Sequence, residues 1–317
     1  MIDADVRVMD DEDHQVTNKA PNFTVAICAS VKDAEAYLQE WIDYHLTGLE
    51  FDQIYIYDNS NDFQLRRWFN STRQHPEYQH VEVNHYPGGK TQQDAYYKCV
   101  NKYGKNGPRH DYIALIDYDE FIVLQQSRHA SIHDLLEEYL HPYGGALAIN
   151  WLYMGSANRT VYSPIPVTKR FQYSDGGPHG IVKTIVKSSD FVDVHNPHTV
   201  ELRQNSSIYE PSSPGTLAVS SPSGASNHNK PGEIALVHHY RFMSDKEFLL
   251  RQGWRNSIDG VNRGCDEESS RKINMTGKAK HLHPRTGTVF NDKAWNFLVK
   301  KVPKYSIYDL NDYQDFF

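Results

Sequence analysis

Short apolar runs alternate with amphipathic stretches through the first half of the chain. The runs have the length and the β-branched and aromatic content of buried strands. They lie at residues 23–28, 53–57, 80–84 and 112–116. Residues 33–45, 63–69 and 91–103 between them carry apolar side chains at helical spacing. This alternation predicts an α/β fold with a doubly wound, mostly parallel sheet and helices on both faces.

The fourth run leads directly into two aspartates, Asp117 and Asp119. Because side chains alternate along a strand, we expect both carboxylates to face one cavity and Tyr118 to face the opposite side. Carboxylate oxygens favour Mg²⁺ or Mn²⁺, and such ions keep positions open for a substrate's phosphates. A solvated strand end is the usual alternative for an Asp-x-Asp triplet. Ligands of open α/β sheets bind at the carboxyl ends of strands, however, so we predict a metal site that holds a diphosphate.

The first strand-to-helix turn lacks the glycine-rich loops of other nucleotide-binding enzymes. Residues 29–33 match neither the dinucleotide fingerprint nor the P-loop, and they lack the glycine-rich loop expected of a sugar nucleotidyltransferase. The second predicted strand ends instead in Asp58 and Asn59. A carboxylate there can accept hydrogen bonds from a ribose or a base, whereas the alternative is an Asp that only forms a turn. We therefore predict that Asp58 and Asn59 bind the nucleotide of a donor.

Composition limits the partners of this chain. Its 317 residues carry a formal net charge of -7, and the pI is about 6.2. Nucleic acid is therefore not an expected partner. No apolar run is long enough to span a bilayer, and the first residues lack the apolar core of a signal peptide, so no direct membrane insertion is expected.

Two compartments remain open at this stage. Asn-x-Ser/Thr triplets start at Asn22, Asn70, Asn158, Asn205 and Asn274, which favours a secretory compartment. If the chain is the catalytic part of a longer protein, we expect the Golgi or secretory lumen, and otherwise the cytoplasm. Cys28 and Cys99 lie in a predicted strand and a predicted helix, and are expected to be core residues.

Several blocks of the sequence resemble, in order, the GT-A-type glycosyltransferases of the family-2-like and family 92 groups. The blocks are residues 32–41 with 44–45, 54–60, 117–121, 149–151 with 155–156, 183–186, 195–198 and 238–248. The resemblance covers about residues 23–260. The chain departs from the pattern at Asp33-Ala34, where Asn-Glu is usual, and in an insertion at 204–232.

The resemblance implies a single GT-A-like domain that transfers a sugar from a UDP- or GDP-sugar to an acceptor hydroxyl, on a glycan, with Mn²⁺ or Mg²⁺. A cation at Asp119, supported by Asp117, would neutralise the charge that develops on the β-phosphate. One alternative is a nucleotidyl- or phosphoryl-transfer enzyme that uses the same aspartates. Another is a non-catalytic relative that binds glycan or nucleotide.

The later blocks supply the remaining candidate site residues. We expect Lys183 and Arg241 to contact the diphosphate. GT-A enzymes often complete the metal shell with a later histidine, and His239 is the first choice here and His198 the second. Trp151 is expected to stack on the acceptor sugar.

An inverting transfer, which we expect, needs a carboxylate to take the proton of the acceptor hydroxyl. Asp175, in a polar loop after the Trp151 block, is the predicted base, and Glu120, Asp259 and Glu267 are alternatives. A retaining enzyme would need no such base.

The pattern also divides the chain into regions. Residues 1–20 carry several charges and no periodicity, so we expect a disordered lead-in. The transferase domain is predicted at 21–260, with a nucleotide-binding half at 21–125 and an acceptor half at 126–260. Residues 206–232, within the insertion, are rich in Ser, Pro and Gly and are expected to form a mobile loop. Residues 261–317 are predicted to be a helical extension packed on the domain.

Overall fold

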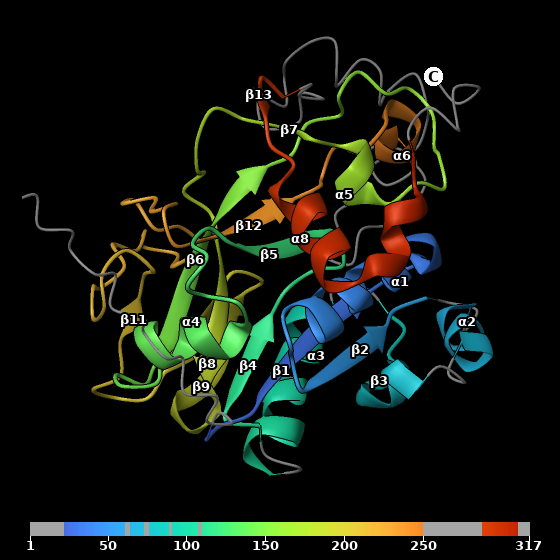
Figure 1. Ribbon diagram of the computed structural model, residues 1–317. Coiled ribbons are helices and arrows are strands. Elements are labelled where there is room, and N and C mark those ends of the chain that lie inside the picture. The colour runs from blue at the N-terminus through green and yellow to red at the C-terminus, as the bar shows by residue number, and fades with distance from the viewer. Residues whose placement is uncertain are drawn as a thin grey trace, which may run out of the picture.

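The amino-terminal half of the chain forms the predicted parallel strands. The computed structural model describes residues 22–60, 64–72, 76–88, 91–106, 110–249 and 287–309. The first strands are β1 (Val25–Val31), β2 (Gln53–Asp58), β3 (Val81–His85) and β4 (Tyr112–Leu115). β1 pairs in parallel with β2 and with β4, and β2 pairs in parallel with β3. The first three strands are followed by α1 (Glu35–Ile42), α2 (Gln64–Thr72) and α3 (Gln92–Cys99), which confirms the predicted alternation (Figure 1).

The second half of the chain continues the same sheet in mixed directions. Its strands are β5 (Glu120–Leu124), β6 (Ala146–Tyr153), β8 (Val182–Lys187), β11 (Ile208–Tyr209) and β12 (Ala235–His239). The strand order is β3-β2-β1-β4-β8-β6-β12-β5, and β11 pairs with β6. β8 runs antiparallel to both β4 and β6, and β5 antiparallel to β12. Figure 1 shows both halves side by side in one twisted sheet, which confirms the α/β fold class and adds antiparallel pairs that the sequence did not predict.

The other elements surround this sheet. The helices are α4 (Ile132–Tyr139), α5 (Val167–Arg170), α6 (Asp245–Leu249) and α8 (Lys293–Lys301). The short strands are β7 (Tyr173–Ser174), β9 (Phe191–Asn196), β10 (Thr199–Leu202) and β13 (Val289–Phe290). Further turns are π-helical, η1 (Asp43–Gly48) and η3 (Val100–Lys105), or 3-10, η2 (Pro76–His80), η4 (Ser188–Asp190) and η6 (Pro303–Ile307). No helix in the described ranges is long and apolar enough to cross a membrane.

Two of the predicted helices differ from the sequence prediction in the same way, at their carboxyl ends. The helices expected at 33–45 and 91–103 each consist of an α-helix followed by a π-helical turn, η1 and η3 respectively. Hydrophobic spacing changes little between these helix types over one turn, so the pattern predicted a helix without revealing the change. α4 begins at a capping box, in which the Ser131 hydroxyl accepts from Asp134 N and the Asp134 carboxylate accepts from Ser131 N.

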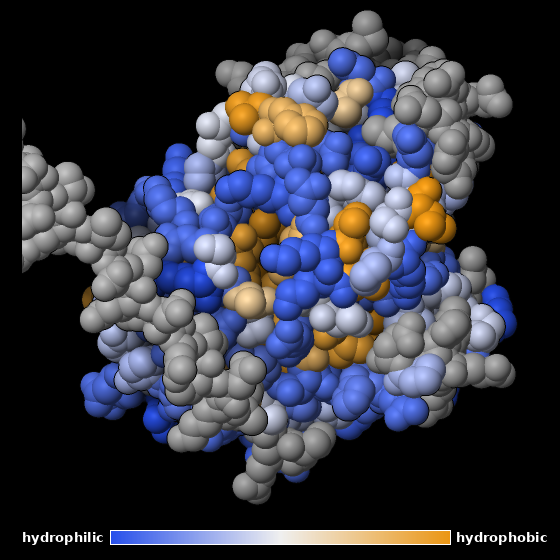
Figure 2. Space-filling view, viewed as in Figure 1, coloured by the Kyte–Doolittle hydropathy of each residue, from blue (hydrophilic) through white to orange (hydrophobic). Residues whose placement is uncertain are grey.

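The sheet separates two apolar layers. Val25, Ile27 and Ala29 of β1 face a layer that includes residues of α1, α4 and α8, whereas Ala26 and Cys28 face a second layer that includes residues of α3. Alternate side chains of a buried strand serve opposite faces, so this strand needs a continuous apolar run. The face seen in Figure 2 is mostly hydrophilic, and its apolar side chains appear in small separate patches.

A disulfide joins β1 to α3 through the second layer. Cys28 and Cys99 are fully buried and bonded, with their Cα atoms 6.3 Å apart. Both are core residues as predicted, but the sequence did not indicate the bond because 71 positions separate them. The bond fixes α3 against the centre of the sheet.

The insertion at 204–232 packs on the sheet, in contrast to the expected mobile loop. β11 adds to the edge of β6, and Asn227 Nδ2 donates to both Asn150 Oδ1 and Glu210 Oε2. Both Glu210 and Asn227 are buried. Hydrogen bonds between polar residues distant in sequence leave no apolar signal, so composition alone indicated a loop. The boundary expected at residue 260 falls within 250–286, which lies outside the described residues, as do residues 1–20.

The environment of His45 predicts how the stability of the fold changes at acid pH. Its ring is fully buried, with Nδ1–H donating to Trp41 O at 2.8 Å and Nε2 accepting from Ile122 N at 3.4 Å, so the structure requires the neutral imidazole. Burial lowers the pKa of His45 from 6.5 to about 3. Below pH 6.5 the unfolded chain binds a proton that the folded chain does not bind until about pH 3, so the free energy of unfolding falls as pH falls through this window. We expect His45 to contribute up to about 1.4 kcal/mol per pH unit to that slope.

Urea unfolding from pH 7 to pH 4 measures the effect. His45→Gln should reduce the slope of unfolding free energy against pH by an amount that corresponds to the uptake of up to one proton on unfolding. The same change at the exposed His195 should leave the slope unchanged. An unaltered slope in His45→Gln would contradict a neutral buried imidazole.

Candidate active site

The carboxyl ends of β1, β2 and β4 meet at one edge of the sheet, and the predicted acidic residues lie there. Asp58 is the last residue of β2, whereas β4 ends at Leu115, so Asp117 and Asp119 belong to the turn before β5. Side-chain alternation does not extend into this turn. The expectation that both aspartates face one cavity is therefore replaced by two different environments.

Asp117 is held by donors of the protein itself. Its Oδ2 lies 3.0 Å from Lys183 Nζ, and its Oδ1 accepts from Gln92 Nε2 at 2.6 Å and from Tyr96 OH at 2.7 Å. Gln92 and Tyr96 are one turn apart on α3, which the disulfide fixes. Both carboxylate oxygens of Asp117 are thus engaged by neighbouring side chains.

Lys183 is the buried cation of the site. Its side chain is 1% exposed, and Nζ lies 3.0 Å from Asp117 Oδ2, 3.3 Å from Glu120 Oε2 and 3.2 Å from Pro197 O. Burial lowers the pKa of Lys183, but the Asp117 and Glu120 carboxylates outweigh it and hold the pKa well above its usual range. Burial raises the pKa of Glu120, and the Asp117 and Asp119 charges raise it further against the opposing Lys183. Lys183 is thus shared between the carboxyl groups of Asp117 and Glu120.

Asp119 contacts His239 instead. His239 is the last residue of β12, paired with Glu120 at the start of β5, and this register places His239 Nε2 3.2 Å from Asp119 Oδ2. Tyr240 N donates to Asp119 O at 2.8 Å and fixes the turn. The side chains of His239 and Asp119 are both buried.

This pair fits a divalent cation. With metal–ligand distances of ~2.1 Å, adjacent ligand atoms of one ion lie about 3 Å apart, close to the separation of Asp119 Oδ2 from His239 Nε2. Within the described residues, no three or more His, Cys, Asp or Glu side chains gather in metal-binding geometry. A cation here would take two protein ligands and fill its shell with phosphate and water oxygens.

Asp58, at the same carboxyl edge of the sheet, has a carboxylate oxygen that can accept a hydrogen bond. It is fully buried, and Oδ1 accepts from Ser60 N at 2.9 Å, whereas Oδ2 has no hydrogen-bond partner in the described part of the chain. A buried carboxylate oxygen is costly without a donor, so a ligand hydroxyl or amide would stabilise it. Asn59 Nδ2 lies 2.8–2.9 Å from Tyr86 O, Gly88 O and Thr91 Oγ1 and holds the loop before α3, whereas its buried Oδ1 also has no hydrogen-bond partner in the described part of the chain.

Trp151 packs between the two candidate histidines. Its ring centroid lies 4.2 Å from that of His239 and 5.1 Å from that of His198, and it is only 4% exposed. Its indole Nε1 is buried as well and has no hydrogen-bond partner in the described part of the chain. His198 Nδ1 lies 3.1 Å from Val182 O, and burial, with Lys183 nearby, lowers the His198 pKa to about 4. His198 therefore borders the site as a neutral ring behind Trp151.

The remaining predicted residues lie around this centre. Asp175 follows β7, and its N donates to Tyr153 O at 3.0 Å, while the Tyr153 ring lies 5.6 Å from that of His239. Arg241 is part-exposed and lies two residues beyond the end of β12. Of the alternative bases, Glu120 is buried against Lys183, and Asp259 and Glu267 lie outside the described residues.

Sequence reasoning missed Gln92, Tyr96 and Tyr153 and assigned Glu120 no structural role. The spacing of Gln92 and Tyr96 by four residues, on the helix that ends in Cys99, was a usable signal for one polar helix face. Nothing in the sequence indicated that this face contacts Asp117. The contact depends on the order of the strands in the sheet, which places α3 beside the end of β4.

The Lys183 cluster gives a stability prediction. Lys183→Met leaves the Asp117 charge partly buried without its cation, and removing one partner of a buried pair costs roughly 3–5 kcal/mol. Asp117→Asn in the same chain should restore a part of that loss, because it removes the charge of one of the two carboxyl groups that Lys183 contacts.

A double-mutant cycle by urea unfolding measures the coupling, with Lys187→Met on the same strand as the control. Additive effects of Lys183→Met and Asp117→Asn would rule out a direct charge pair.

Comparison with known proteins points to one family. The family model of glycosyltransferase family 92 matches residues 24–280. A search of curated proteins returned no match.

Three solved structures are similar over about half of this chain. TarS of S. aureus (residues 1–349) has 12% identity and a TM-score of 0.33, with 52% of this chain and 47% of that chain covered. The mannosyltransferase PcManGT of Pyrobaculum calidifontis, in complex with GDP-Man and Mn²⁺, has 13% identity and a TM-score of 0.30, with 53% and 46% covered. Mannosyl-3-phosphoglycerate synthase of Rubrobacter xylanophilus has 15% identity and a TM-score of 0.31, with 53% and 55% covered.

The matches thus span about half the length of these three proteins, and the family assignment rests on the family model. Because that model covers most of the sequence, the chain belongs to glycosyltransferase family 92.

Proposed function

We propose that this glycosyltransferase moves a sugar from a UDP- or GDP-sugar to a hydroxyl of a glycan or glycoconjugate, with inversion and with a divalent cation. The observation that carries the proposal is the contact of Asp119 with His239 at the carboxyl edge of the sheet. A carboxylate oxygen and an imidazole nitrogen at this separation suit one ion. Imidazole is a softer ligand than the oxygen that Mg²⁺ prefers, so Mn²⁺ is proposed over Mg²⁺.

The proposed roles of the aspartates differ. Asp119 and His239 would hold the cation, which when bound neutralises charge on the leaving diphosphate. Asp117, engaged by Lys183, supports the turn that carries Asp119, and Lys183 adds a fixed positive charge beside the diphosphate. Arg241 is proposed as a further phosphate contact.

Asp58 is proposed to bind the nucleoside. Its Oδ2 has no partner among the described residues and can accept from a ribose hydroxyl or a base N–H. The Asn59 amide fixes the neighbouring loop and so shapes the same side of the pocket. Nucleoside and diphosphate would then lie along one edge, from β2 to β4.

Asp175 is proposed as the general base. In an inverting transfer its carboxylate takes the acceptor's proton as the hydroxyl oxygen attacks the anomeric carbon and the bond to the diphosphate breaks. Supporting this role, Asp175 is anchored to Tyr153, which packs against His239. Trp151 and His198 form the wall behind the metal pair.

Calorimetry on nucleosides and nucleoside diphosphates tests the division of roles. We expect UDP or GDP to bind with Mn²⁺ and to lose at least about tenfold in affinity with chelator, with Asp119→Asn or with His239→Gln, since metal-site lesions typically cost ten- to a hundredfold. Uridine or guanosine binding should not change in these variants.

Asp58→Asn is the matched contrast, because it should weaken nucleoside and nucleoside diphosphate by similar factors. Diphosphate affinity that is indifferent to both chelator and Asp119→Asn would overturn the metal proposal.

We also propose that the enzyme works in a secretory lumen. The Cys28–Cys99 disulfide supports this, because disulfides persist mainly in oxidising compartments. The asparagines of the described triplets are all exposed and thus open to glycosylation: Asn22, Asn70, Asn158 and Asn205. Asn274 lies outside the described residues.

Intact mass after secretion from eukaryotic cells checks this. Endoglycosidase should remove mass, Asn158→Gln should lack one glycan, and Cys28 and Cys99 should resist alkylation in denaturant until they are reduced. Free thiols and an unmodified chain would favour the cytoplasm.

A further inference from the structure

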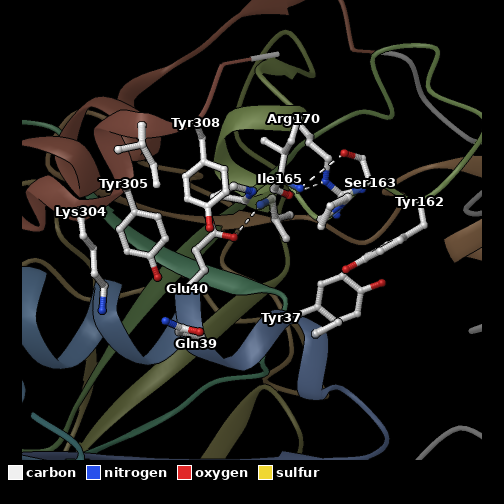
Figure 3. A pocket seen from close by; sticks show the side chains of 15 residues that line it. Tyr37, Gln39, Glu40, Tyr162, Ser163, Ile165, Arg170, Lys304, Tyr305 and Tyr308 are labelled. Carbon is white, nitrogen blue, oxygen red and sulfur yellow. Dashed lines mark hydrogen bonds between the residues drawn. The ribbon is translucent and has the colours of Figure 1, made fainter. Parts of the chain in front are cut away.

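A cavity of about 270 Å³ lies beside the active site, between α1, the loop before α5, and η6. None of the proposed donor or metal residues lines it. Figure 3 shows tyrosines at its two ends, with Glu40 and Ile165 between them. Its walls come from three segments that are distant in sequence, so the fold builds the cavity as a whole.

Two pairs of aromatic rings define the ends. Tyr37 of α1 and Tyr162 lie 6.4 Å apart and nearly perpendicular. Tyr305 and Tyr308 lie 6.1 Å apart, with an angle of 27° between their planes. The Tyr37 and Tyr305 hydroxyls donate to Glu247 Oε1 and Asp43 Oδ2, so these two rings offer mainly their apolar faces. Tyr162 and Tyr308 line the cavity with ring and hydroxyl, and Gln39 adds an exposed amide.

The charged groups around the cavity already have partners. Arg170 donates to both carboxylate oxygens of Glu247 at 2.9 and 3.0 Å. Lys304 Nζ lies 3.0 Å from Asp43 Oδ2. A ligand phosphate or carboxylate would therefore compete with existing ion pairs at either end.

Glu40 is also satisfied by the protein. Its carboxylate accepts from Val167 N at 2.5 Å and from Thr168 N at 2.9 Å, at the start of α5. Burial raises the pKa of Glu40, while these hydrogen bonds act in the opposite direction. With its carboxylate committed to the backbone, the cavity gives a cationic ligand no open counter-charge among the described residues.

We propose that this cavity binds a neutral sugar unit of the acceptor glycan, away from the unit that receives the transferred sugar. Ring faces that pack on C–H groups, with hydroxyl and amide groups around them, match the chemistry of an uncharged pyranose. The volume is slightly below the ~300 Å³ at which sites for drug-sized ligands begin, so one ring fits.

The cavity shares a wall with the active site. The ring of Tyr37 stacks on that of Tyr118 at 6.0 Å, and Tyr118 lies between Asp117 and Asp119. The Tyr37 hydroxyl donates to Glu247 Oε1 at 2.9 Å, which fixes the ring. An oligosaccharide could thus pass this wall with one unit in the cavity and another at the metal pair. The inference rests on the proposed function, because it assumes a glycan acceptor.

Saturation-transfer NMR of the full chain with a panel of neutral and acidic oligosaccharides tests the proposal. We expect at least one neutral oligosaccharide to bind, and Tyr162→Ala and Tyr308→Ala to weaken it roughly three- to tenfold, as loss of an aromatic contact would. Ala36→Trp removes no contact but fills the opening, and should abolish binding. Tyr143→Ala, at an exposed tyrosine after α4, is the matched control and should have no effect.

The same variants are titrated with UDP or GDP and Mn²⁺, and these affinities should not change. No binding of any neutral oligosaccharide at millimolar concentration, or binding unaffected by Tyr162→Ala and Ala36→Trp, overturns the sugar site. Failure of the wild-type protein to bind any nucleoside diphosphate would instead count against the proposed function. The oligosaccharide titration would still test the cavity independently.

Discussion

The buried ammonium of Lys183 holds the candidate active site together. It brings β8 to the turn after β4 and contacts both the partly buried Asp117 carboxylate and the buried Glu120 carboxyl group. A buried cation is tolerated only when its partners are close and hydrogen-bonded, so this contact constrains the backbone of the whole turn. Asp119 and its contact with β12 follow from that constraint.

The consequence is that the two aspartates are not equivalent. Asp117 is saturated by Lys183 and by the Gln92 and Tyr96 side chains of α3, whereas Asp119 faces His239. The disulfide that fixes α3 belongs to the same arrangement, because it stabilises the helix that supplies two of the donors. Tyr118 between the aspartates packs on Tyr37 and links the Asp119–His239 contact to the tyrosine-lined cavity. One short turn therefore borders both the candidate site and the cavity.

The sequence predicted the parts of this protein that leave a local signal. Apolar runs located β1 to β4, and Asp58 and Asp117 lie at or just after the carboxyl ends of β2 and β4. The rule that side chains alternate along a strand did not apply at Asp119, because β4 ends four residues earlier. The Lys183 cluster, the Cys28–Cys99 bond and the packed insertion around Asn227 all join positions distant in sequence, so they follow from the mixed strand order that no single segment encodes. His239 was found through family resemblance, and its contact with Asp119 depends on the register of β12 against β5.

Pulsed EPR of bound Mn²⁺ measures the ligand set most directly. With Mn²⁺ and UDP or GDP on the wild-type chain, the account predicts ³¹P coupling from the diphosphate and ¹⁴N coupling from one imidazole. The ¹⁴N coupling should disappear in His239→Gln and persist in His198→Gln. Phosphorus coupling without any nitrogen coupling in the wild type, or nitrogen coupling that survives His239→Gln, would contradict a cation held by Asp119 and His239.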